Sequence, residues 1–88
     1  MTASAARPRL RNGVRLSFDR VRDVDVVLFP EGVLVLNATA AAVLNLCDGK
    51  AAVDDIVETL GRRYEGVRAE DVQKVLDRLR DRKVVEWT

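Results

Sequence analysis

The side chains that most often carry out catalysis or hold metals are scarce in this sequence. It contains one cysteine, Cys47, and no histidine, which excludes an intramolecular disulfide, a cysteine cluster and the histidine-dependent catalytic triads. Asp54 and Asp55 are neighbours, and neighbouring side chains on a helix point about 100° apart, so this pair does not converge on one substrate. We interpret both as charges that favour the positive end of a helix. The sequence therefore predicts no enzyme: no catalytic residue, no metal site and no cofactor.

Composition and charge restrict the class of partner. The chain has 88 residues, 48% of them hydrophobic, which suffices for one domain with one core. Its 15 basic and 14 acidic residues leave a formal charge of +1, which argues against general attraction to nucleic acid or to an anionic membrane. No apolar run could cross a bilayer, and residues 1–11 lack the apolar core of a secretory signal. We expect a cytoplasmic protein with a disordered tail over residues 1–6 and a single domain over residues 7–88.

Alternating hydrophobicity predicts three strands in the first half of the sequence. In residues 14–18 apolar side chains alternate with polar ones, which is typical of a strand with one buried face. Residues 24–29 begin with the same alternation, but Val27 and Phe29 make the opposite face apolar as well, so this second strand is one-sided at its start and two-sided at its end. Pro30 and Gly32 then predict a tight turn, because proline fixes φ and glycine tolerates a left-handed conformation. The return strand, residues 33–36, is aliphatic at every position. Neither of its faces can be assigned to water, so we expect something to cover both.

Helical spacing predicts three helices in the rest of the sequence. They cover residues 38–47, 53–66 and 69–82, each with apolar side chains three and four residues apart. Asn37 is expected to cap the first helix, because its side-chain oxygen can accept a backbone N–H of the first turn. Residues 84–87 predict a short extended segment packed back onto the domain. The predicted fold is α+β: a winged-helix-like domain with three N-terminal antiparallel strands followed by three helices.

Two classes of function fit that order of elements. A winged-helix protein that binds DNA needs a helix with an exposed basic or polar face, whereas the third predicted helix alternates acidic and basic residues. The alternative uses residues 33–36, because an extended peptide can add to an exposed strand edge. The same edge can instead be buried in the fold, or pair with a second copy of the chain in a self-associating scaffold. From the residues alone, these alternatives stay open.

Five blocks of the sequence resemble a known family in order and spacing. The stretch from Asn37-Ala38-Thr39-Ala40 to Cys47-Asp48-Gly49 is the most specific part, and the resemblance covers roughly residues 7–87. The blocks look like the successive motifs of the PqqD family, the peptide chaperones of pyrroloquinoline quinone biosynthesis, also called RiPP recognition elements: Arg7-Pro8-Arg9-Leu10, Gly13-Val14-Arg15-Leu16-Ser17-Phe18-Asp19, Leu28-Phe29-Pro30-Glu31-Gly32, Leu36-Asn37-Ala38-Thr39-Ala40-Ala41-Ala42-Val43-Leu44 and Leu46-Cys47-Asp48-Gly49.

The resemblance implies a peptide-binding groove between the third strand and the third helix. In the family, that groove holds the leader of a ribosomally made precursor peptide (PqqA-like) and presents it to a radical SAM enzyme (PqqE-like). Carried over to this chain, the strand wall is Val33, Leu34, Val35 and Leu36, and the helix wall is Val75, Leu76, Arg78 and Leu79. The three apolar helix residues can equally be plain core. Arg78 best distinguishes a peptide groove from plain core, because a guanidinium at the groove rim can bind a carboxylate of the leader.

The partner stays open in two respects. Relatives of this family also serve other ribosomal peptide pathways, so the resemblance implies a precursor peptide without identifying it. A strand that is apolar on both faces also allows a homodimer. Neither nucleic acid nor membrane is expected as a partner.

Overall fold

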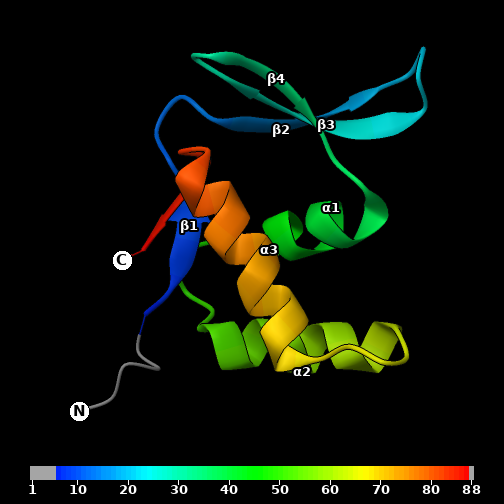
Figure 1. Ribbon diagram of the computed structural model, residues 1–88, viewed down its shortest axis with the longest axis vertical. Helices are drawn as coiled ribbons and strands as arrows, with labels where there is room; N and C mark the ends of the chain where they lie inside the picture. The colour runs from blue at the N-terminus through cyan, green and yellow to red at the C-terminus, as the bar shows by residue number, and fades with distance from the viewer. Residues whose placement is uncertain (1–5, 88) are drawn as a thin grey trace.

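The computed structural model, which describes residues 6–87, consists of a three-stranded sheet, a two-stranded sheet and three helices (Figure 1). The three-stranded sheet lies at one end of the molecule and α2 at the other, with α1 between them and α3 running across both helices. The elements are β1 (Pro8–Leu10), β2 (Arg15–Asp19), β3 (Val24–Phe29), β4 (Gly32–Val35), α1 (Ala38–Asn45), α2 (Val53–Arg63), α3 (Ala69–Asp81) and β5 (Val85–Trp87).

The three-stranded sheet has the order β2-β3-β4 and is antiparallel throughout. Val27 of β3 lies opposite Leu16 of β2 and Leu34 of β4, so these side chains share the face that packs on the core, and Val27 is fully buried. The opposite face carries Val33 and Val35, which are 62% and 49% exposed. The expectation that both faces of this strand are covered is therefore wrong within residues 6–87, because these residues provide no element for the outer face.

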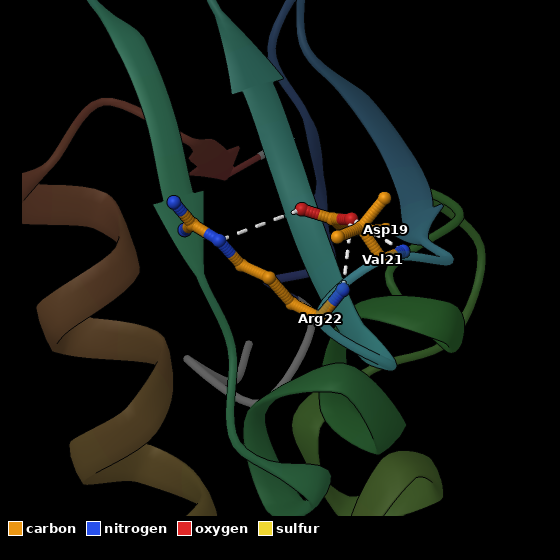
Figure 2. Close-up of polar contacts among 3 residues, drawn as sticks. All are labelled: Asp19, Val21 and Arg22. Carbon is orange, nitrogen blue, oxygen red and sulfur yellow. Dashed lines mark hydrogen bonds and ion pairs between the residues drawn. The ribbon is translucent and has the colours of Figure 1, made fainter.

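Two tight turns set the register of this sheet. Phe29 pairs with Gly32 across a two-residue turn, and the φ of +144° at Gly32 is one that a side chain would strain. At the other end, the Asp19 carboxylate accepts the backbone N–H groups of Val21, at 3.0 Å, and Arg22, at 3.2 Å, while the Arg22 guanidinium lies 3.8 Å from the same carboxylate (Figure 2). This side-chain capping closes the turn from β2 into β3.

The helices begin and end close to where the sequence predicts. Asn37 caps α1, with its Oδ1 accepting the Ala40 N–H at 2.8 Å, as expected. Helix α2 begins after Ala52, which has no capping oxygen; the Asp55 carboxylate instead accepts the Ala52 N–H at 3.1 Å. Asp55 therefore has the structural role at the helix start that its position predicts.

Helix α3 is the centre of the core. It contacts α1, α2 and β5, and its Leu76 is fully buried, as are Val43 of α1 and Ile56 of α2. Burying side chains of this size stabilises the fold by about 1.5–3 kcal/mol each. The helix is thereby held against the rest of the domain, so the part of its surface beside β4 has a fixed position.

The two-stranded sheet corrects the predicted number of strands. Strands β1 and β5 pair antiparallel, with Pro8 opposite Trp87, and Arg9 and Glu86 form an ion pair of 2.7 Å. The extended segment predicted for residues 84–87 is confirmed, but its partner β1 was not expected, because three residues that include a proline carry no readable period. The α+β class and the order of strands followed by helices are confirmed, although the likeness to a winged helix is loose.

The predicted tail over residues 1–6 falls outside the described residues except for Ala6, which is half-buried. Among residues 6–87, no helix is long and apolar enough to span a membrane.

Candidate functional site

Strand β4 is an open edge of the three-stranded sheet. Its one partner strand among the described residues is β3. The Leu36 N–H donates to the Asp25 carbonyl at 2.9 Å, and in an antiparallel pair such hydrogen-bonded residues alternate with residues whose backbone groups point away. Leu34, two residues earlier, is therefore bonded to β3, while Val33 and Val35 direct their N–H and C=O groups to the open side. These four groups are ready to pair with another strand.

A cavity of about 170 Å³ lies between this edge and α3. Leu34, Val35 and Leu36 line its strand side, and Val75, Arg78 and Leu79 line its helix side. The structure thus brings together most of the residues that the sequence nominates for a groove. We call this space and the adjoining β4 edge the β4–α3 groove.

Two nominated residues lie outside the lining of this cavity. Val33 stands on the outer face of the sheet, next to Leu28 of β3, and both are exposed. Leu76 is fully buried in the core beneath the groove. Val33 can still contribute its backbone groups to the open edge, whereas Leu76 contributes packing that supports the helix wall.

Three lining residues were not nominated: Asn37, Ala40 and Arg82. Arg82 follows Arg78 by four residues, a spacing that places two side chains on the same side of a helix, so this signal was available in the sequence. Asn37 and Ala40 are shared with the start of α1, and their place in the groove depends on how α1 packs, which periodicity does not reveal.

The charged side chains that line the groove are all positive. Arg78 and Arg82 are its charged lining residues, and no acidic residue lines it. Across residues 6–87, no side chain forms an ion pair or hydrogen bond with either guanidinium. The two cations are therefore available to a bound molecule.

Cys47 is unsuited to act as a nucleophile or as a metal ligand. Burial, and secondarily the negative charge of Asp48, raises the pKa of its thiol to about 12, and the thiol lies 3.3 Å from the Val43 carbonyl. The thiol is thus neutral at physiological pH, and the thiolate is the reactive form. Among the described residues, His, Cys, Asp and Glu side chains form no cluster of metal-binding size.

Comparison with known proteins identifies the family. The family described as "Coenzyme PQQ synthesis protein D (PqqD)" matches residues 26–85. The PqqA binding protein of Kluyvera intermedia is 40% identical over 81 residues, which cover 90% of this chain and 88% of that protein. The bifunctional coenzyme PQQ synthesis protein C/D of Methylorubrum extorquens is 42% identical over 82 residues, 90% of this chain but 22% of its own length.

A solved structure agrees in fold. It is the solution NMR structure of the PqqD truncation of Methylobacterium extorquens PqqCD, described as a functional and stand-alone recognition element for ribosomally synthesized and post-translationally modified peptides. The TM-score is 0.71 at 38% sequence identity, covering 90% of this chain and 87% of that one.

Proposed function

The chain belongs to the PqqD family, and from this premise we propose that it is a peptide chaperone of pyrroloquinoline quinone biosynthesis that binds a PqqA-type precursor peptide in the β4–α3 groove. It acts by binding and not by bond chemistry. The observation that carries the proposal is the open β4 edge beside a cavity lined by residues of β4 and α3.

Strand addition explains how this edge can hold a peptide. An extended segment pairs its backbone with the free groups of Val33 and Val35, which supplies affinity, and its side chains alternate between the two faces of the sheet. Those that face inward meet Leu34 and the α3 side of the groove. Those that face outward lie beside the exposed Val33 and Leu28.

The expected affinity is moderate. Four backbone hydrogen bonds contribute about 0.5–1.5 kcal/mol each, and burial of apolar groove surface adds about 25 cal/mol per Å². Ordering a flexible peptide and losing its translational freedom cost about 4–15 kcal/mol. Because these costs are of the same size as the gains, we expect a moderate Kd, around the micromolar range.

The wider role follows from the same proposal. Residues 7–88 act as one peptide-binding unit, which presents the precursor to a PqqE-like radical SAM enzyme. Fusion of a similar segment to a second protein in the bifunctional C/D relative supports the view that this domain works close to other components of its pathway.

Isothermal titration with the Kluyvera intermedia PqqA peptide tests the proposal. Saturable one-to-one binding in the micromolar range or tighter is expected. Absence of heat, together with absence of any amide shift in a parallel NMR titration, contradicts it. Sedimentation of the free protein separates the remaining alternative, because a self-associating scaffold that fills its own edge is a tight dimer that does not respond to peptide.

A further inference from the structure

We propose that the β4–α3 groove selects a peptide with an acidic side chain at an inward-facing position, and that Arg78 and Arg82 together read this carboxylate. The inference rests on the proposed function and deepens it, because it adds to sequence-tolerant backbone pairing a side-chain requirement. The occupant is thus a peptide strand with an Asp or Glu that faces α3.

The position of the two arginines supports this role. Both line the cavity: Arg78 stands in the last turn of α3, and Arg82, four residues later, is the residue that caps the end of this helix, its backbone N–H donating to the Arg78 carbonyl. Leu79, between them in sequence, is 2% exposed and lines the same cavity, so this end of the helix is anchored in the core. A guanidinium presents donors in a planar fork that fits a carboxylate.

Neighbouring acids do not satisfy these cations. Asp77 accepts a hydrogen bond from the Gln73 side chain at 2.9 Å, and Asp81 lies 3.7 Å from Arg80. Within residues 6–87, the guanidinium groups of Arg78 and Arg82 form no ion pair and no hydrogen bond. A bound carboxylate therefore replaces no existing ion pair and meets two positive charges beside a low-dielectric wall.

Strand geometry fixes where the acidic residue stands in the peptide. For a strand that adds antiparallel to β4, the residues opposite Val33 and Val35 exchange hydrogen bonds and point their side chains to the outer face. The residue opposite Leu34 points inward, to the side on which α3 lines the cavity. The acidic residue thus occupies a position whose own N–H is not needed for pairing, and the two residues that flank it are the ones whose backbone pairs.

Arginine variants test the charge requirement. Arg78→Gln and Arg82→Gln are each expected to weaken binding of the Kluyvera intermedia PqqA peptide about fivefold, and the double variant more than about tenfold. Arg78→Lys should recover part of the loss, since it keeps the charge. The matched control is Arg80→Gln, which removes the same charge from the same helix but lies away from the groove, in the lining of another cavity, and should change Kd less than about twofold.

Salt and peptide chemistry complete the experiment. Raising ionic strength from about 0.05 M to about 0.5 M should weaken the wild-type complex several-fold and the double variant little. A PqqA peptide with every Asp and Glu replaced by Asn and Gln should bind the wild type and the double variant equally. If the wild type binds PqqA but the double variant binds within twofold of it, the charge inference is overturned while the proposed function stands. If the wild type binds no PqqA even at low salt, the proposed function fails, and this inference with it.

Discussion

Replacing Val35 with proline should prevent a peptide from pairing with the open β4 edge while the three-stranded sheet stays folded. The Val35 N–H is not part of the β3–β4 ladder, because the bonded residues are its neighbours Leu34 and Leu36. Proline has no N–H, and its ring occupies the space of the incoming strand, so the two hydrogen bonds at this residue are lost together. At about 0.5–1.5 kcal/mol each, this is about 1–3 kcal/mol, or about a fivefold to hundredfold increase in Kd.

Titration calorimetry with the PqqA peptide measures this change, with circular dichroism to verify the fold. Val35→Ala is the matched control, because it shortens the same half-exposed side chain but keeps the N–H, and we expect it to change Kd less than about threefold. Leu34→Pro is the opposite control: its N–H belongs to the ladder with β3, so the same substitution one residue away should unfold the sheet.

The prediction depends on the backbone groups of Leu34 pointing toward β3 and those of Val35 pointing away from it. If Val35→Pro keeps its fold and binds the peptide within twofold of the wild type, the peptide does not pair with this edge. If Val35→Ala weakens binding as much as Val35→Pro, side-chain contact and not backbone pairing holds the peptide.

The remaining predictions concern stability and reactivity. Leu76→Ala should lower the free energy of unfolding by about 2–5 kcal/mol in urea denaturation, because Leu76 is fully buried; a smaller loss together with weaker peptide binding would instead assign it to the groove wall. The Cys47 thiol, with its pKa raised to about 12, should react slowly with a thiol reagent at about pH 8 and rapidly after denaturation; fast labelling of folded protein contradicts this. Hydrogen bonds from the backbone N–H groups of Ala51 and Lys50 lower the pKa of Asp48 below 3.8, so its carboxylate stabilises the fold above that pH and the contribution disappears as pH falls through the lowered value. The acid unfolding of Asp48→Asn should therefore depend less steeply on pH, and an unchanged pH profile would refute this role.

Much of the groove could be predicted because its two walls carry strong local signals. The aliphatic run at residues 33–36 and the proline-glycine turn before it predict a return strand, and the apolar spacing of residues 69–82 predicts the helix. Which side chains of the strand face inward depends on its register with β3. That register is set by the turn that pairs Phe29 with Gly32.

Other features depend on contacts that a sequence pattern does not contain. Strand β1 is three residues long, and the ion pair between Arg9 and Glu86 that joins it to β5 spans nearly the whole chain. Leu76 belongs to the same apolar stripe as Val75 and Leu79, so the sequence pattern alone also assigns it to a groove wall. Only the packing of α3 against α1 and α2 shows that Leu76 is fully buried. Arg82 could have been found from its spacing to Arg78, yet its place beside β4 requires the tertiary structure.

An NMR titration of the ¹⁵N-labelled protein with the PqqA peptide tests peptide binding in the β4–α3 groove most directly. We predict that the largest amide shifts fall on β4 and on the groove side of α3, and that amide exchange at Val33 and Val35 slows on binding, because these are the N–H groups that the peptide covers. Saturable shifts confined to α2 and the β1–β5 sheet, with unchanged exchange at Val33 and Val35, would contradict the account.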